Sequence, residues 1–202
     1  MDLSAKKPEV ENGFLLGLEK ATLQPMPPPY AWRITKYDPS LRNSHGHYLI
    51  DEWTSFSDIG KTYGGKTLTY EKDLLVESAY SYSALCFLND AEIPSLQVSE
   101  LENNRLSRVK AEELRDIDFD PRSLEVGLVV NERDLEDVVR LNLREIIWCK
   151  LIETENFYLH FGWDYYIYIG SISPSLPAIS YARRNGLFVE EMISPYLYQD
   201  DA

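Results

Sequence analysis

Apolar and polar positions alternate most regularly over residues 156–171. Large apolar side chains occupy every second position over residues 157–161, and the same period of two resumes over residues 165–169. This is the period of a β-strand, and Gly162 with Asp164 supplies the residues of a turn between the two halves. The pattern therefore predicts a β-hairpin, whose aromatic side chains, each burying about 150–250 Å², form the centre of the core.

Apolar residues at helical spacing predict three helices. The longest covers residues 70–89 with Thr69 as its N-cap, and the second covers residues 132–143 with Asn131 as its N-cap. A short third helix is predicted over residues 177–185. The strands predicted outside the hairpin cover residues 30–37, 93–101, 124–130, 145–153 and 187–193.

Short turns join the consecutive strands of the second half, so these strands are expected to be antiparallel neighbours. The chain is therefore predicted to be an α+β protein with an antiparallel sheet and helices packed on one face. Three parts are expected: a flexible Pro-rich arm over residues 1–28, a segment over 29–122 with the long helix, and a β-α-β-β-β-α-β segment over 123–202. The pattern leaves open whether the last two parts form two small subdomains or share one core.

The composition is that of a folded protein. Of its 202 residues, 44% are hydrophobic and 12% aromatic, which excludes a mainly disordered chain. The N-terminus lacks an apolar stretch behind its lysines, and no apolar run approaches the roughly 18 residues of a membrane span, so we expect a cytoplasmic protein with no membrane partner. Cys86 and Cys149 have apolar neighbours and are expected to be free thiols.

Acidic residues outnumber basic ones, 33 against 20, and the formal net charge is −13. A field of this sign repels phosphate backbones and attracts basic proteins, so a nucleic-acid partner is not expected and a basic protein partner is favoured. Acidity that serves only solubility is the alternative. The candidate partner-binding residues are the carboxylates of one acidic segment and two tyrosines of the hairpin: Glu112, Glu113, Asp116, Asp118, Asp120, Tyr166 and Tyr168.

Three histidines are the candidates for metal binding or catalysis. His45 and His47 flank a glycine near several carboxylates, and imidazole with carboxylate suits zinc or iron. His160 with Asp164 would place a carboxylate beside an imidazole across the hairpin turn, as in a tuned general base. Gly60–Thr67 matches the bare phosphate-loop pattern but lacks a buried strand before it and a helix directly after it. No cofactor is expected.

Two parts of the chain resemble segments of short, uncharacterised bacterial proteins that are associated with toxin-immunity gene neighbourhoods. The first part is Trp32–Pro39 followed by Asp51–Gly60, and the second is Phe157–Ser171. The resemblance covers these stretches alone and implies no site residues. It favours a protein-binding module.

The sequence thus predicts an acidic protein-binding module, expected to be an immunity- or antitoxin-like inhibitor of a basic toxin such as a nuclease. Charge would speed the encounter with the toxin, and buried aromatic side chains would slow its release. Two alternatives stay open. One is a small enzyme or metal-binding protein that uses His45 and His47 or His160, and the other is a structural or regulatory homodimer that pairs through strand edges.

Overall fold

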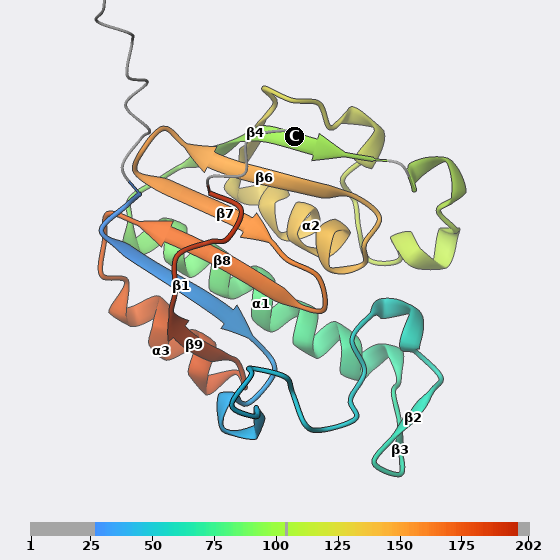
Figure 1. Ribbon diagram of the computed structural model, residues 1–202. Coiled ribbons are helices and arrows are strands. Elements are labelled where there is room, and N and C mark those ends of the chain that lie inside the picture. Colours follow the sequence, from blue (N-terminus) through green and yellow to red (C-terminus); the bar gives the residue numbers. More distant parts are fainter. Residues whose placement is uncertain (1–26, 104, 198–202) are drawn as a thin grey trace, which may run out of the picture.

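The computed structural model describes residues 27–103 and 105–197, and it shows one large sheet with helices against one face (Figure 1). Seven antiparallel strands form this sheet in the order β5-β4-β6-β7-β8-β1-β9, which confirms the predicted α+β architecture. The strands are β1 (Tyr30–Thr35), β4 (Ser95–Glu102), β5 (Val129–Asn131), β6 (Trp148–Glu153), β7 (Phe157–Phe161), β8 (Tyr166–Ser171) and β9 (Phe188–Glu191). The helices are α1 (Tyr70–Asp90), α2 (Glu132–Leu143) and α3 (Leu176–Arg184), and a separate hairpin pairs β2 (Thr62–Tyr63) with β3 (Lys66–Thr67).

The predicted hairpin is confirmed as β7 and β8, and it lies in the interior of the sheet with β6 on one side and β1 on the other. Its register sets Leu159 opposite Ile169 and Phe161 opposite Ile167, and all four side chains are buried. Because side chains alternate between the faces of a strand, these residues share one face with Leu151 of β6, which lies opposite Leu159. The apolar row is therefore continuous across the centre of the sheet.

Both long segments of the chain contribute to this sheet. Strand β1 comes from the first segment and lies between β8 and β9 of the second, while β4 lies between β5 and β6. One hydrophobic cluster includes buried residues from both segments, among them Ile34, Phe87, Leu135 and Ile167. The two segments share one core, and of the predicted Pro-rich arm only residues 27 and 28 lie within the described part of the chain.

The two longer helices begin where the sequence predicts, and α3 begins one residue earlier than predicted. The Thr69 side chain accepts a hydrogen bond from the backbone of Lys72, and the Asn131 side chain accepts hydrogen bonds from the backbone of Arg133 and Asp134. The apolar spacing of α1 predicts the helix but not its buried face, because two of the apolar positions, Leu75 and Tyr82, are 73% and 45% exposed. Polar residues are buried in their place: Asp73, Glu77, Ser81 and Ser83. Among the described residues, no helix combines the length and apolar character needed to cross a bilayer.

The predicted strand over residues 124–130 is wrong for most of its length, because only its last two residues belong to β5 (Val129–Asn131). Gly127 has a φ of +95°, which is incompatible with a regular extended strand, and its backbone bonds to Val98 instead. Leu124 is nevertheless buried, because it packs into the core from a loop that follows a 3₁₀ turn over Pro121–Ser123. The apolar run thus correctly predicts that Leu124 is buried, but it does not form a strand there.

The stretch Gly60–Thr67 is the β2–β3 hairpin. Gly64 and Gly65 both have positive φ angles, 54° and 76°, as the two central residues of a tight two-residue hairpin turn require. The backbone N–H of Gly60 donates to the carbonyl of Leu68, and the N–H of Leu68 donates to the carbonyl of Lys61. These bonds join the two ends of the hairpin, so the stretch does not form a phosphate-binding loop. The geometry is that of a turn, as the sequence context indicates.

The face of the sheet opposite the helices is also covered at its centre. We name residues 192–197 the C-terminal strap, which crosses this face after β9 (Figure 1). Ser194 of the strap is hydrogen-bonded to His160 Nδ1 at 2.9 Å, and its backbone N–H donates to the Tyr158 hydroxyl. Tyr158 in turn lies over Gly170, where an added Cβ would be 2.1 Å from the ring. The strap explains why residues 157–161 are buried on both faces.

A fully buried ion pair joins α1 to the end of α2. Arg144 donates from Nε to Glu77 Oε1 at 2.7 Å and from Nη2 to Oε2 at 2.6 Å, and both side chains are 0% exposed. The remaining Arg144 nitrogen, Nη1, donates to the backbone carbonyls of Glu113 and Arg115. Burial would lower the pKa of Arg144, but the hydrogen bonds and charge of Glu77 raise it overall, so the guanidinium stays charged.

We expect Glu77→Ala to destabilise the protein by about 3–5 kcal/mol, because it leaves the Arg144 charge buried without its partner. The double variant Glu77→Leu with Arg144→Met should lower the free energy of unfolding by less than the sum of the two single substitutions, since neither charge is then left unpaired. Urea unfolding measures the free energy of each variant.

The matched control is Glu112→Ala, which removes an exposed partner 3.9 Å from Lys110. Its effect should not exceed about 0.5 kcal/mol. Equal effects of Glu77→Ala and Glu112→Ala would show that the buried pair has no special role.

Candidate partner-binding site

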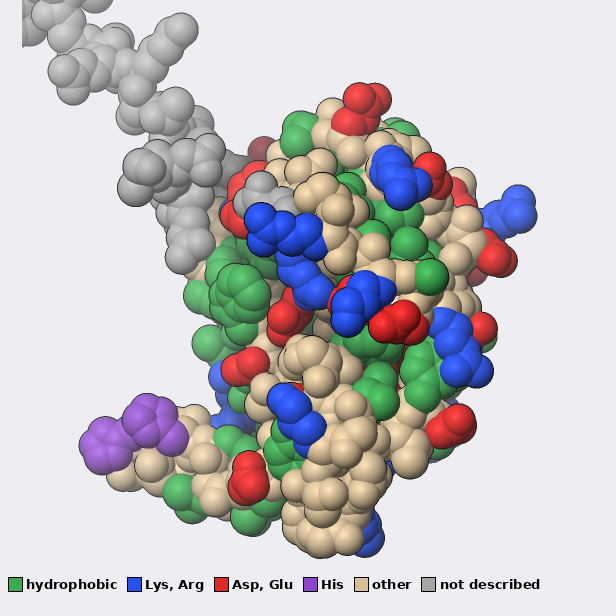
Figure 2. Space-filling view, turned by 90° about the vertical axis from the view of Figure 1, so that its right-hand side faces the viewer, with side chains coloured by type: hydrophobic (Ala, Val, Ile, Leu, Met, Phe, Trp, Pro, Cys, Tyr) green, Lys and Arg blue, Asp and Glu red, His purple; other side chains and the backbone are tan. Residues whose placement is uncertain are grey.

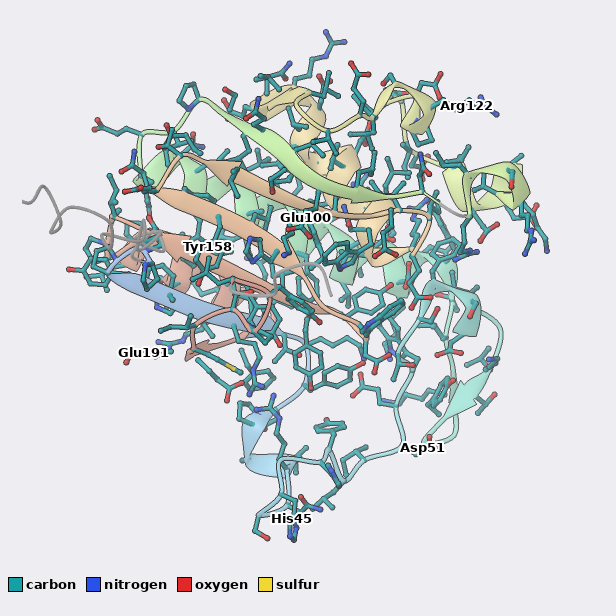
Figure 3. All side chains as sticks on the ribbon, turned by 45° about the horizontal axis from the view of Figure 1, so that its top comes forward. His45, Asp51, Glu100, Arg122, Tyr158 and Glu191 are labelled. Atoms are coloured by element: carbon teal, nitrogen blue, oxygen red, sulfur yellow. The ribbon has the colours of Figure 1, made fainter. Side chains whose placement is uncertain are left out.

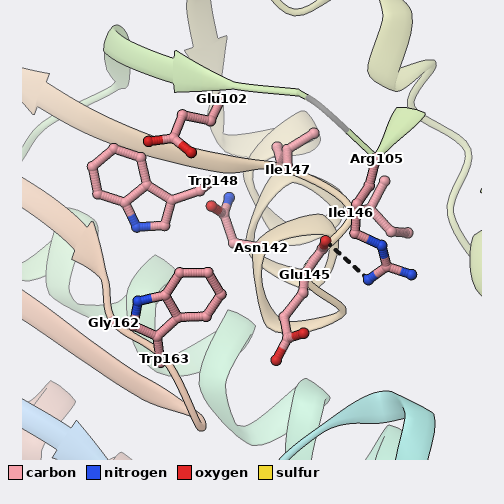
Figure 4. A pocket seen from close by; sticks show the side chains of 9 residues that line it. All are labelled: Glu102, Arg105, Asn142, Glu145, Ile146, Ile147, Trp148, Gly162 and Trp163. Atoms are coloured by element: carbon pink, nitrogen blue, oxygen red, sulfur yellow. Dashed lines mark hydrogen bonds between the residues drawn. The ribbon is translucent and has the colours of Figure 1, made fainter. Parts of the chain in front are cut away.

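A pocket of about 240 Å³ lies at one end of the sheet, where segments distant in the sequence meet (Figure 4). The end of β4, the loop between α2 and β6, the first residue of β6 and the β7–β8 turn all contribute to it. Its lining residues are Glu102, Arg105, Asn142, Glu145, Ile146, Ile147, Trp148, Gly162 and Trp163.

The β7–β8 turn presents Trp163 to solvent in an unusual backbone conformation. Tyr166 N donates to the carbonyl of Trp163, and the two residues between them, Asp164 and Tyr165, have φ angles of 58° and 61°. This is the pattern of a type I′ hairpin turn, which normally has Asn or Gly at these positions, and a bulky residue there is strained. The Trp163 side chain is 69% exposed beside the pocket.

Contacts in the protein interior hold Tyr165 in this conformation. Its hydroxyl donates to Asp73 Oδ1 at 2.7 Å, its carbonyl accepts from the Tyr80 hydroxyl, and its ring meets that of Trp53 edge-on at 4.9 Å. These buried contacts offset the cost of the positive φ. The interior contacts of Tyr165 consequently fix the turn, while Trp163 faces the solvent.

The back of the pocket is rigid and needs no further hydrogen bonds. Trp148 Nε1 donates to the carbonyl of Phe161 at 2.7 Å, which fixes the indole ring. The Asn142 amide is satisfied internally, since it donates to Val138 and accepts from the backbone of Cys149. The pocket is therefore preformed, with an aromatic wall.

Carboxylates outnumber cations at the pocket. Glu102 and Glu145 form no salt bridge with any described residue. Burial raises the pKa of Glu145, and the nearby Arg105 opposes this increase. Arg105 itself is already hydrogen-bonded, to Glu113 at 2.6 Å and to the carbonyls of Arg144 and Glu145. The pocket therefore keeps a negative local charge.

The predicted acidic segment lies partly next to this pocket. Glu113 connects the segment to the pocket, because it pairs with the pocket residue Arg105. Asp116 accepts a hydrogen bond from the Tyr70 hydroxyl at 2.8 Å, while Glu112 and Asp120 are exposed and only loosely paired with nearby basic residues. Asp118 is exposed as well. Figure 2 shows this end of the molecule, with acidic, basic and apolar side chains interspersed rather than one continuous acidic patch.

The two predicted tyrosines lie on the sheet face that the C-terminal strap crosses. Tyr168 is only 7% exposed and contacts Tyr196 of the strap, with ring centres 5.8 Å apart. Tyr166 is half-buried, with the guanidinium of Arg33 over its ring and Tyr37 beside it. The structure therefore places neither tyrosine as a freely exposed partner-binding side chain.

The histidines fall into two different environments. His45 and His47 lie in an exposed loop that projects away from the sheet (Figures 2 and 3), with ring centres 6.3 Å apart. In the part of the chain that the structure describes, no three or more His, Cys, Asp or Glu residues are grouped so that they could hold a metal ion. His160 is buried, stacks on Tyr158 and bonds to Ser194 rather than to Asp164. Burial, with a smaller effect of Lys150, lowers its pKa to about 3, so the imidazole is neutral at physiological pH.

Comparison of the chain with protein-family models, curated proteins and solved structures finds no match in any of the three. Sequence reasoning missed Trp148, Trp163, Glu102 and Glu145 as site residues. The signal for Trp163 was its position: a large aromatic side chain at the tip of a hairpin lies outside the alternating pattern that buries its neighbours.

Asp73, which holds the turn through Tyr165, should make stability depend on pH. Its side chain is fully buried, and Oδ2 has no hydrogen-bond partner among the described residues. Burial raises the pKa of Asp73 from 3.8 to about 7, and the charge of Glu77 adds to the increase. The folded protein therefore binds this proton more tightly than the unfolded chain, and the resulting stabilisation is lost as the pH rises through about 7.

Asp73→Asn should remove this part of the pH dependence, which amounts to at most about 4 kcal/mol between pH 4 and pH 8. Relative to the wild type, the variant should gain stability as the pH rises, measured by urea unfolding across that range. Asp51→Asn, at an exposed position, is the control. Parallel stability curves for Asp73→Asn and the wild type would contradict the assignment.

Proposed function

We propose that this chain is an acidic protein-binding module that holds a basic protein partner at the pocket beside Trp163. The observation that carries the proposal is the exposed indole of Trp163, held on a strained turn next to unpaired carboxylates. The cost lies in the turn that carries this ring, because Asp164 and Tyr165 both have positive φ angles, and backbone strain of this kind is concentrated at binding and active sites.

The pocket has the features of an interface anchor. Tryptophan is among the residues that most often dominate the binding energy of protein interfaces, particularly beside a preformed pocket. Trp148 is fixed by its bond to Phe161, and Trp163 is carried by a turn that Tyr165 holds in place. Little ordering is then needed on binding, which reduces the entropic cost.

The charge of the chain favours one class of partner. A net charge of −13 attracts basic proteins over long distances, while the carboxylates at the pocket supply local complementarity. Nucleases and other toxins that act on nucleic acid need a basic surface to hold the phosphate backbone. We therefore propose an immunity- or antitoxin-like inhibitor that covers such a surface on a basic toxin.

The test is affinity capture of the tagged full-length chain from its native host, followed by mass spectrometry and measurement of binding to the captured protein. We expect one small basic protein in equimolar amount, with an association rate that falls as salt is raised. Trp163→Ala should weaken binding by about 2 kcal/mol or more, which is about 30-fold, because the anchor is lost.

Leu176→Ala is the matched control, since Leu176 is as exposed as Trp163, at 69%, but lies on α3 outside the pocket. It should leave the affinity unchanged. Equal losses for both variants would contradict the pocket as the binding site. A clean monomer that carries a metabolite or metal, or a homodimer with no second protein, would contradict the module itself.

A further inference from the structure

The chain holds two of its own buried cations in the same way. Lys36 Nζ lies 3.9 Å from the centre of the Trp53 ring and donates to Glu52 at 2.8 Å. The Arg144 guanidinium lies 4.7 Å from the centre of the Phe56 ring and is bound by Glu77. In both places, contact with an aromatic ring and an ion pair with a glutamate replace part of the hydration that the cation loses on burial.

The pocket presents the same combination of groups at the surface. Figure 4 shows the indole rings of Trp148 and Trp163 with Glu102 and Glu145 on either side of them. The one cationic lining residue, Arg105, already bonds to Glu113 and to two backbone carbonyls. An indole face and two carboxylates are thus available to a cation from outside the chain.

A neighbouring lysine already contacts one of the pocket rings, Trp148, but neither Trp163 nor the two pocket carboxylates. Lys150 Nζ lies 5.8 Å from the centre of the Trp148 ring and donates to Glu100 at 2.7 Å, and neither residue lines the pocket. The ring of Trp163 has no aromatic or cationic contact among the described residues. Its exposed face is therefore the surface on which an incoming cation would stack.

The size of the pocket limits what can enter. A volume of about 240 Å³ is below the range of roughly 300–1,000 Å³ that is typical of small-molecule and cofactor sites, but it is sufficient for one long side chain. Between the two cationic side chains, arginine suits the pocket better. Its planar guanidinium stacks flat on an indole and can donate to carboxylates on two sides, whereas the ammonium of lysine is compact and more strongly hydrated.

We propose that this pocket is the subsite for a single arginine side chain of the partner, which stacks on Trp163 against the wall formed by Trp148 and donates to Glu102 and Glu145. The proposal rests on the proposed function, because it names the chemical group by which a basic protein would be recognised at the same site.

The experiment titrates the ¹⁵N-labelled full chain with three capped tripeptides, Gly-Arg-Gly, Gly-Lys-Gly and Gly-citrulline-Gly, and follows the indole N–H signals by NMR. Citrulline has the shape of arginine without its charge. The arginine peptide should shift the Trp163 and Trp148 signals saturably, with an affinity at least about fivefold higher than the lysine peptide. The citrulline peptide should cause no saturable shift. The buried Trp32 and Trp53 are internal controls and should not move.

Variants at the two carboxylates test the role of charge without removing the rings. Glu102→Gln and Glu145→Gln should each weaken the binding of the arginine peptide by about three- to tenfold. Glu112→Gln is the matched control, because Glu112 is an exposed carboxylate that does not line the pocket. It should change the affinity by less than twofold.

Three results would overturn the proposal: equal affinity for the arginine and citrulline peptides, equal affinity for the arginine and lysine peptides, or no saturable shift of Trp163 and Trp148. This test uses no partner protein, so its outcome is separate from that of the proposed function. Saturable arginine binding with no protein captured from the host would support the subsite and contradict the partner-binding role. If a partner is captured and its binding depends on Trp163, but the peptides show no preference for arginine, the partner-binding role is supported and the arginine subsite is contradicted.

Discussion

The buried pair of Arg144 with Glu77 is the interaction on which the arrangement around the pocket depends. Two charges removed from water are tolerated only when each is fully bonded, and here the guanidinium also binds two carbonyls of the acidic segment. The pair therefore joins α1, the end of α2 and that segment at one point. Glu145 follows Arg144 directly with a φ of 56°, so the position of this pocket carboxylate is a consequence of where the ion pair forms.

Most of the fold could be predicted because its elements depend on local signals. The period of two in the hairpin and the caps Thr69 and Asn131 act over a few residues, and the structure contains them where the sequence indicates. The prediction of a strand over residues 124–130 was wrong because burial and an extended backbone are separate properties. The positive φ of Gly127 interrupts the extended backbone but leaves Leu124 buried. No periodicity reveals that β1 lies between two strands of the distant C-terminal segment.

The site was harder to predict than the fold because it is made by tertiary contacts. The acidic segment predicted a negatively charged site, yet its member Glu113 is engaged within the chain, by the side chain of Arg105 and the backbone N–H of Lys110. The tyrosines that looked like exposed anchors are covered or half-covered, since the C-terminal strap packs on the second face of the hairpin. Trp163 remains exposed because Tyr165, two residues later, is held by Asp73 from a helix 92 residues away in the sequence.

The position of β1 also governs the order in which the molecule can form. Arg33 of β1 binds Glu190 of β9, which is 157 residues later, and β1 is hydrogen-bonded on its other edge to β8. During synthesis, the first strand of the sheet must wait unpaired until the last strands have left the ribosome. Contacts this distant in sequence make folding slow, and a waiting apolar strand is prone to aggregate. Because β9 pairs with β1 alone among the described strands, this edge of the sheet is complete only when the first strand lies between β8 and the last strand.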